Sequence, residues 1–355
     1  MINTQNLSIT SEILSLIAEI DEFKGAWRIM ADLTPERLST LRRVATIESI
    51  GSSTRIEGGQ LSDREVEDLL FNLKRRAYAS RDEQEVAGYA ETIQTVIASF
   101  ETIPLTENYI KQLHRDLLKY SEKDTRHRGE YKKNRNDVGA YDENGVLIGV
   151  VFQTASPLQT PFFMRELVEW TEEHLVSRTL HPLLVIGIFI VVFLEIHPFQ
   201  DGNGRLSRIL TTLLLLRAGY LYTPYSSMEN IIEHNKEAYY LALRQTQSSI
   251  RADQPNWQPW LVFFLKTLQK QVHKLADKIS REKSALVSLS ESSLKISDLL
   301  QNHGLLTIGQ IAEATRLNRN TLKSQLRKLV KEKHLKKYGQ GRLTKYGINP
   351  TEEKI

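Results

Sequence analysis

The spacing of apolar residues predicts a largely helical protein. In the first hundred residues, apolar side chains recur every three or four positions, which is typical of amphipathic helices. The pattern predicts helices over 11–20, 35–50, 62–78 and 84–100, with a further helix opening at Thr106. The third has a start signal of its own, because Ser62-Asp63-Arg64-Glu65 has the spacing of a capping box.

Residues 183–196 form the most apolar run of the chain. These 14 residues are too few to cross a bilayer, so we interpret them as a buried core helix and expect no membrane partner. A second apolar run over 209–216 also predicts a helix, which Gly219 would end. The short loop between the two runs would therefore open a helix.

The helical rhythm breaks between residues 128 and 161. Asn144-Gly145 is typical of a tight hairpin turn, and 146–152 has the composition of a strand. We expect a short β-hairpin here.

The C-terminal pattern predicts a winged helix-turn-helix domain. Three helices are expected over 294–302, 307–314 and 321–331, with Asn318-Arg319-Asn320 as the turn before the third and a β-wing over 336–348. A serine-rich junction over 284–293 marks the boundary of this domain.

The net charge of +4 is unevenly distributed. Residues 316–345 hold eleven Lys or Arg and one acid, which leaves 36 of the 47 basic and 42 of the 43 acidic residues elsewhere. This balance favours an anionic partner for the C-terminal domain, with DNA contacted by the third helix and the wing. Docking of a protein stays open, since winged helices also serve that purpose.

The composition excludes several kinds of chemistry. A length of 355 residues allows two or three domains, and the absence of cysteine excludes disulfides, thiolate nucleophiles and zinc–thiolate sites. The first residues lack the basic and apolar segments of a secretion signal, so we expect a cytoplasmic protein.

The richest chemistry lies in residues 197–208, His-Pro-Phe-Gln-Asp-Gly-Asn-Gly-Arg-Leu-Ser-Arg. His197 can take a proton near neutral pH, and Asp201 is a ligand of the kind that Mg²⁺ prefers. Glycines at the start of a helix let backbone N–H groups converge on phosphate oxygens, and Arg205 and Arg208 can clamp further phosphate. Together these residues predict transfer of a phosphate-containing group from a nucleotide to a hydroxyl.

This stretch resembles the signature of the Fic family, His-Pro-Phe-x-Asp/Glu-Gly-Asn-Gly-Arg-x-x-Arg, with every specified position filled. The resemblance implies a mainly α-helical Fic fold with a β-hairpin flap, and a protein adenylyltransferase that moves AMP from ATP to a Ser, Thr or Tyr hydroxyl of a target protein. It makes His197 the catalytic base and Asp201 the Mg²⁺ ligand. The nucleotide would meet Gly202, Asn203, Gly204, Arg205, Leu206, Ser207 and Arg208.

A second motif, Ser53-Thr54-Arg55-Ile56-Glu57-Gly58, is similar to the inhibitory pattern of Fic proteins whose inhibitory helix is N-terminal. The resemblance implies that Glu57, with Ser53, pairs with Arg208 and takes the place of the γ-phosphate of ATP. It also implies an adenine pocket at Tyr239 and Tyr240. Gln247 stands where many relatives carry Asn, which leaves its role open. The target would add a strand to the flap at Val150, Val151, Phe152 and Gln153.

We therefore expect an N-terminal helical region (1–105), a Fic catalytic core (106–283) and a winged-helix domain (284–355). Three alternatives stay open: another nucleotide donor, removal of AMP, and a DNA-binding regulator that senses nucleotide. The sequence does not identify the target, and the protein itself is one candidate. Fic proteins often pair, so a homodimer is compatible with this prediction.

Overall fold

The computed structural model describes residues 2–30, 35–72, 78, 80–141, 147–252, 254–287, 291–331, 334–339 and 344–348. It divides into two compact units, Met1–Leu275 and Ala276–Ile355. The boundary falls inside helix α11 (Gln258–Val287). The finer divisions expected after residues 105 and 283 stay predictions.

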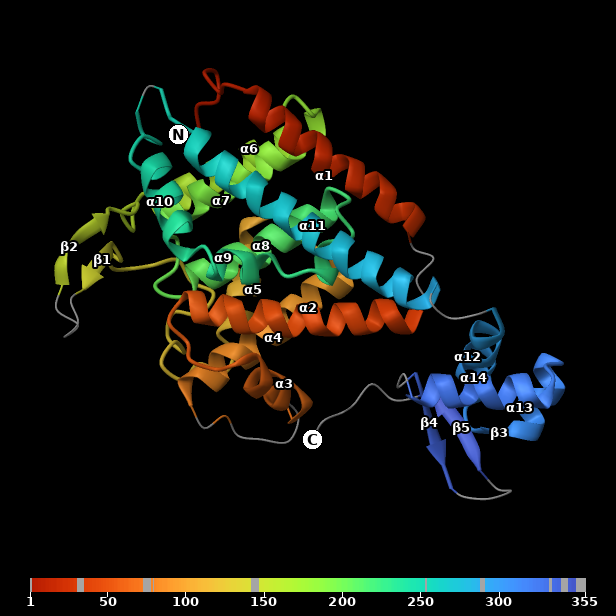
Figure 1. Cartoon of the computed structure of the whole chain (residues 1–355). Coiled ribbons are helices and arrows are strands. Elements are labelled where there is room, and N and C mark those ends of the chain that lie inside the picture. Colours follow the sequence, from red (N-terminus) through yellow and green to blue (C-terminus); the bar gives the residue numbers. More distant parts are fainter. Residues whose placement is uncertain are drawn as a thin grey trace. The chain divides into compact units, whose positions relative to one another are not determined.

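The first unit is built from helices, as the hydrophobic pattern predicts (Figure 1). In chain order they are α1 (Ser11–Met30), α2 (Pro35–Ile56), α3 (Asp63–Asn72), α4 (Arg81–Ser99), α5 (Glu107–Leu117), α6 (Thr160–Ser177), α7 (Pro182–Ile196), α8 (Asn203–Arg217), the short 3₁₀ turn η1 (Thr223–Tyr225), α9 (Met228–Glu233), α10 (Lys236–Gln247) and most of α11.

The caps of two helices differ in how well the sequence predicts them. The expected capping box is present at α3, where the Ser62 backbone N–H donates to Glu65 Oε2 over 2.8 Å. That helix ends at Asn72, short of the expected end at residue 78, and 73–77 lie outside the described residues. The next helix begins at Arg81 rather than residue 84, because the Ser80 hydroxyl accepts from the Glu83 N–H and caps it.

The centre of the unit is formed by α7 and α8. Every α7 residue from Leu183 to Ile196 is buried, as its apolar run predicts, and α8 packs against it. In Figure 1 the two helices lie inside a shell that includes α1, α2, α6 and α11. In the described part of the chain, no helix has both the length and the hydropathy that a bilayer span requires. The loop 197–202 is thus held between two core helices.

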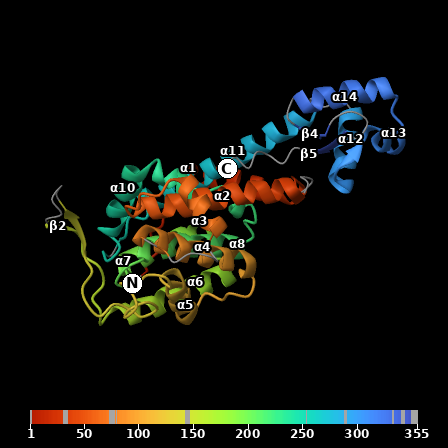
Figure 2. The same cartoon turned by 90° about the horizontal axis from the view of Figure 1, so that it is seen from below.

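The expected hairpin is present beside this helical unit. Strands β1 (Val138–Tyr141) and β2 (Leu147–Phe152) pair antiparallel, with Val138 opposite Phe152. The predicted turn at Asn144-Gly145 lies outside the described residues. The ribbon projects from the helices in both views (Figures 1 and 2).

The second unit has the order of elements of a winged helix. Helices α12 (Glu291–His303), α13 (Ile308–Thr315) and α14 (Arg319–Lys331) accompany strands β3 (Leu306–Thr307), β4 (Leu335–Tyr338) and β5 (Lys345–Ile348). The sheet is antiparallel with the order β3-β5-β4.

Two boundaries in the second unit were predicted wrongly. Arg319 and Asn320, expected in the turn, already belong to α14; the chain reverses earlier, at Arg316, whose φ is 55°. The junction expected over 284–293 is shorter, because α11 continues to Val287 and α12 begins at Glu291.

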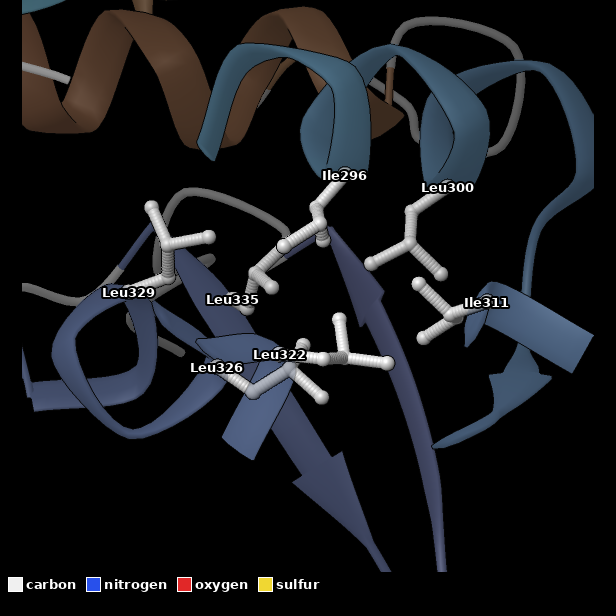
Figure 3. Packing of buried hydrophobic residues seen from close by; sticks show 7 residues of the cluster. All are labelled: Ile296, Leu300, Ile311, Leu322, Leu326, Leu329 and Leu335. Carbon is white, nitrogen blue, oxygen red and sulfur yellow. The ribbon is translucent and has the colours of Figure 1, made fainter. Parts of the chain in front are cut away.

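Seven aliphatic side chains make the core of this unit. Figure 3 shows them directed toward one another from three helices and one strand. They are Ile296, Leu300, Ile311, Leu322, Leu326, Leu329 and Leu335. The basic side chains of α14 are exposed instead: Lys323, Arg327, Lys328 and Lys331.

Candidate active site

The loop between α7 and α8 depends on two left-handed residues. His197 ends α7 with a φ of 52°, and its N–H donates to the Phe193 carbonyl. Gly202 begins α8 with a φ of 79°, a conformation that only glycine adopts without strain. Asn203, the first residue of α8, exchanges two hydrogen bonds with the Phe199 backbone, of 2.9 and 2.6 Å. The loop is thereby fixed at both ends.

The start of α8 offers backbone donors to an anion. No side chain caps this helix, and its first intrahelical hydrogen bond runs from the Leu206 N–H to the Gly202 carbonyl. Helix geometry therefore leaves the N–H groups of Asn203, Gly204 and Arg205 without an intrahelical acceptor. Such a helix start favours phosphate.

A cavity of about 570 Å³ opens over this helix start. It gathers ten of the residues that the sequence selects: Glu57, His197, Asp201, Gly202, Asn203, Gly204, Arg205, Tyr239, Tyr240 and Gln247. Leu194, Gln200, Leu243 and Arg244 complete its lining.

Four selected residues of the motifs lie behind this lining. Leu206 is fully buried in the core, and the Ser207 hydroxyl donates to the Gly204 carbonyl over 2.8 Å. Ser53 and Arg208 are buried below the cavity. Of these four residues, Arg208 is hydrogen-bonded to Glu57, which lines the cavity.

His197 has the geometry of a neutral base. Its Nδ1 lies 3.2 Å from the Leu194 carbonyl, which can only accept, so Nδ1 carries the hydrogen and Nε2 is the free acceptor. Burial lowers the pKa of His197 to about 4, against the opposing effect of the Leu194 hydrogen bond. At neutral pH the ring can therefore take a proton at Nε2.

Asp201 is a carboxylate surrounded by cations. Its Oδ2 lies 3.1 Å from Lys123 Nζ and 3.4 Å from Arg81 Nη2, and its Oδ1 accepts from the Gly202 N–H. Burial alone would raise the pKa of Asp201, but the charge of Arg205 and the Lys123 hydrogen bond outweigh it and lower the pKa to about 2. Asp201 is thus ionised at neutral pH.

Arg205 and Arg208 are buried guanidinium groups of α8, each 2% exposed. Arg205 lies 2.8 Å from Glu85 Oε2 and 3.3 Å from Asp201 Oδ1. Arg208 donates to Glu57 Oε1 over 2.9 Å and to the hydroxyl and carbonyl oxygens of Ser53, both over 2.8 Å. Burial by itself would lower the pKa of Arg208, but the neighbouring Glu57 carboxylate raises it above the usual range.

The Glu57 carboxylate also lies against the helix start. A Cβ atom at position 204 would overlap Glu57 Oε1, so the contact requires the glycine. Glu57 follows the last residue of α2 and remains 34% exposed on its side chain. The carboxylate therefore occupies the mouth of the anion site from the cavity side.

Helix α10 contributes two aromatic side chains and one leucine to the lining of the cavity, Tyr239, Tyr240 and Leu243. Tyr239 is buried, with its ring 5.1 Å from that of Tyr240 and 5.9 Å from that of Trp260, and burial raises the pKa of Tyr240 to about 12. Leu243, Arg244 and Gln247 follow on the same helix. This surface can hold a flat base while phosphates reach α8.

The comparisons with known proteins agree with this geometry. Residues 104–215 match the Fic/DOC family, and residues 289–333 match the family of winged helix-turn-helix DNA-binding domains. The chain contains a Fic domain. Protein adenylyltransferase Fic of Drosophila sechellia is 31% identical over 186 residues, which are 52% of this chain and 35% of the relative. The chain thus spans about a third of the length of that curated relative.

Solved structures of Fic proteins have a fold similar to that of this chain. A Fic family protein from Desulfovibrio desulfuricans superposes with a TM-score of 0.64 at 24% identity, covering 98% of each chain. A Fic domain containing signaling protein from Bacteroides thetaiotaomicron gives a TM-score of 0.60 at 26% identity, over 74% of this chain and 97% of that one. The predicted fold class, helical Fic bundle and winged helix, is confirmed.

The flap residues of the Fic domain are described mainly through their backbone. Val150, Val151 and Phe152 lie in β2, and Gln153 follows it with an exposed side chain. The side chains of the strand residues are outside the description. The strand itself is present where the sequence predicts it.

The sequence did not reveal several residues that contact the loop 197–202 and hold it in place. The ring of His114 stacks on Phe199 at 3.8 Å, and its Nε2 lies 2.9 Å from the Asp201 carbonyl while Nδ1 accepts from the Gly129 N–H. Burial lowers the pKa of His114 to about 4, which keeps it neutral. Glu85 and Lys132 were missed too, because charged residues in helical or irregular segments are ordinarily surface residues.

The donor set fits a nucleotide better than a resident metal. Among the described residues, no group of three acidic or histidine side chains could hold a metal ion. Asp201 contributes one carboxylate, which suits a Mg²⁺ ion that takes its other ligands from phosphate and water. Arg208 Nη1 and Arg205 Nε are buried without a hydrogen-bond partner in the described part of the chain, so each has a donor to offer.

Proposed function

We propose that this protein is a nucleotidyltransferase that moves AMP from ATP to a Ser, Thr or Tyr hydroxyl of a target protein. One observation carries the proposal: the acceptor nitrogen of His197, the ionised Asp201 and the open N–H groups of α8 line a single cavity. The curated relatives are named protein adenylyltransferases, which agrees with this chemistry. Catalysis would depend mainly on positioning and on stabilising charge.

The reaction requires one proton transfer and one displacement at phosphorus. The hydroxyl of the target gives its proton to His197 Nε2 as its oxygen bonds to the α-phosphorus of ATP. The bond from the α-phosphorus to the bridging oxygen breaks, and pyrophosphate leaves. The N–H groups of Asn203, Gly204 and Arg205 bind phosphate oxygens, and Arg208 neutralises charge at the γ-phosphate. Mg²⁺, held by Asp201, would supply further positive charge to the phosphates.

We further propose that the protein is self-inhibited by Glu57. The carboxylate uses the Arg208 donor that a γ-phosphate would need, at 2.9 Å, and lies against Gly204. A carboxylate and a phosphate compete for one guanidinium because both accept charge-assisted hydrogen bonds from it. ATP would therefore bind with its phosphates misplaced until Glu57 moves.

The flap would hold the target. Strand β2 is at the edge of a two-stranded sheet, so an extended segment can add to it through main-chain hydrogen bonds. The protein itself is a candidate target, and a second copy of the chain is a candidate partner.

Transfer of AMP is tested with ATP labelled at either the α- or the γ-phosphate. Wild type, Glu57→Gly and Glu57→Gly/His197→Ala are incubated with Mg²⁺ and each nucleotide, and protein-bound label is counted. We expect α-label on protein with Glu57→Gly, less with wild type and none with the double variant. Stable γ-label would indicate phosphorylation instead, and label from another nucleotide in preference to ATP would indicate another donor. Loss of AMP from premodified protein would indicate the reverse reaction.

For the second unit we propose binding of DNA. The observation that favours it is the row of exposed basic side chains on α14, at Lys323, Arg327, Lys328 and Lys331. Binding of a fluorescent duplex should weaken with salt, and Lys323→Gln/Arg327→Gln should reduce the slope of log K against log salt by about 2. Binding that ignores salt and these charges would favour a protein-docking role. No transfer of label together with tight DNA binding would favour a nucleotide-sensing regulator.

A further inference from the structure

Lys132 is a buried lysine beneath the catalytic loop. It is 3% exposed and lies in the segment that precedes the flap. Its Nζ donates to the Ile196 carbonyl over 3.0 Å, to Asn136 Oδ1 over 2.7 Å and to the Thr154 hydroxyl over 2.8 Å. An ammonium group has three N–H donors, so these acceptors use all of them. A buried, fully bonded lysine of this kind has a defined place in the structure.

Lys132 and Asn136 together hold the backbone on both sides of His197. Four consecutive carbonyl groups accept from them: Ile196 from Lys132 Nζ (3.0 Å), His197 from Asn136 Nδ2 (3.1 Å), Pro198 from the Lys132 N–H (2.9 Å) and Phe199 from Asn136 Nδ2 (2.6 Å). The hydrogen bond between Lys132 and Asn136 Oδ1 orients the amide that makes two of these contacts. The direction of the imidazole therefore depends on this pair.

The same residues also join the two ends of the flap. Asp137 precedes β1 and Thr154 follows β2, and the Thr154 N–H donates to Asp137 Oδ1 over 3.0 Å. The Thr154 hydroxyl accepts from Lys132 and donates to Asn136 Oδ1 over 2.9 Å. The base of the flap and the loop that carries His197 are thus bonded to one ammonium group.

We propose that Lys132 is a positioning residue for the transfer reaction, which acts through His197 by fixing the imidazole relative to the base of the flap. This inference rests on the proposed function, in which the flap delivers the hydroxyl and His197 removes its proton. The nucleotide is bound elsewhere, by the start of α8. Loss of Lys132 should therefore slow the chemical step and leave the binding of ATP largely intact.

The charge of Lys132 also affects His197, through the pKa of the imidazole. His197 faces Lys132 from the segment before the flap, Glu57 from the end of α2 and Asp201 from its own loop. Lys132 in turn faces Asp137, Glu195 and Arg251. A positive charge beside the ring favours the neutral imidazole, whereas the two carboxylates favour the charged one. Removal of the ammonium should raise the pKa of His197.

The test uses the full chain in the Glu57→Gly background. Lys132→Met removes the charge and keeps most of the side-chain volume, and Lys133→Met, at the exposed neighbouring position, is the matched control. With α-labelled ATP, we expect kcat to fall about 10²-fold in Lys132→Met, with the KM for ATP within about twofold. Lys133→Met should behave as its parent.

A second readout does not depend on activity. The histidines are labelled with ¹³C, and the resonance of His197 is assigned by its absence in His197→Asn. Its pKa in an NMR titration should be higher in Lys132→Met than in the parent, and unchanged in Lys133→Met. If Lys132→Met does not fold, Thr154→Val, which removes the hydroxyl shared by Lys132 and Asn136, should lower kcat about tenfold at unchanged KM.

Two results would overturn the inference: a Lys132→Met protein that is folded and transfers label at the parental kcat, or a loss carried by KM alone. An unchanged pKa of His197 would remove the electrostatic part. Absence of transfer in the Glu57→Gly parent would contradict the proposed function instead, and the titration would still decide whether Lys132 acts on His197.

Discussion

The two arginines of α8 meet carboxylates in very different settings. Arg205 pairs with Glu85, a side chain of the helix interior that is 9% exposed and also binds Arg81. Arg208 pairs with Glu57, which follows the end of a helix, is 34% exposed on its side chain and lines the cavity. The distances are nearly equal, 2.8 and 2.9 Å. The difference in burial is the basis on which we propose a structural role for the first pair and replacement by a ligand for the second.

The largest effect on AMP transfer should come from substitution of His197, which belongs to neither pair. In the Glu57→Gly background, His197→Ala should lower AMP transfer by about 10³-fold, since it removes the general base and leaves both arginines in place. The measurement is protein-bound α-label over time. Arg208→Lys in the same background is the control for a damaged phosphate site, because it should raise the KM for ATP as well. A His197→Ala protein that still transfers AMP at the parental rate would contradict the assignment.

The two carboxylates should differ in what they contribute to stability. Glu85→Gln leaves a buried guanidinium with only Asp201 as its charged partner, and should lower the free energy of unfolding by about 3 kcal/mol. Glu57→Gln should lower it by less than about 1 kcal/mol, because the pair is partly exposed and Ser53 still accepts from Arg208. Urea unfolding of both variants measures the contrast. Equal losses of the free energy of unfolding in the two variants would contradict the difference between the two pairs.

Removal of the Glu57 carboxylate should increase AMP transfer. Glu57→Gly should raise AMP transfer by about 10- to 100-fold, the equivalent of a charge-assisted hydrogen bond between Glu57 and Arg208. Glu85→Gln should not raise it. Activation by both variants, or by neither, would show that the two pairs do not differ in function.

The pH dependence of AMP transfer by Glu57→Gly reports the protonation of His197 in the absence of the contact between Glu57 and Arg208. The base must be neutral to act, and its pKa is lowered to about 4. Loss of the Glu57 carboxylate lowers this pKa further, so transfer should hold from pH 7 down to about pH 5 and fall only below about pH 4. The stability of the fold should change at a higher pH than the activity. His114 and His197 have pKa values in the folded protein below the ordinary 6.5, so as the pH falls the unfolded chain binds protons at these residues before the folded chain does. The free energy of unfolding should decrease as the pH falls from 6.5 toward 4. A loss of kcat already near pH 6.5 would contradict the burial of His197.

The smallest change in AMP transfer should come from substitution of Ser53. Its hydroxyl accepts from Arg208 Nε over 2.8 Å, so Ser53→Ala removes one of three oxygens that orient the guanidinium. The variant should raise basal transfer only a few-fold, about the equivalent of one hydrogen bond of 1 kcal/mol. A larger activation than that of Glu57→Gly would place the inhibitory contact at Ser53.

The sequence predicts the features that depend on neighbouring residues, and it misses those that depend on tertiary contacts. Local signals predicted the Fic loop, the two core helices around it, the flap strands and the winged helix, because periodicity, glycines and caps act over a few residues. The partners of Arg205 were not predictable in this way, since Glu85 lies on another helix and its apolar surroundings depend on tertiary packing. Lys132 was missed for a similar reason: two of its three oxygen partners, on Thr154 and Ile196, are distant in the sequence. The boundary at Arg81 moved because Ser80 caps the helix one turn before the apolar pattern begins.

The contact between Glu57 and Arg208 was expected from the family resemblance alone. Two residues 151 positions apart leave no trace in periodicity or composition. The structure brings them to 2.9 Å, at the cavity that the loop opens.

Calorimetric titration of ATP and ADP into wild type and Glu57→Gly tests the central claim most directly. If Glu57 occupies the place of the γ-phosphate on Arg208, the substitution should tighten the binding of ATP by about tenfold or more relative to ADP, because only ATP has that phosphate. An equal change for the two nucleotides, or none, would contradict the account.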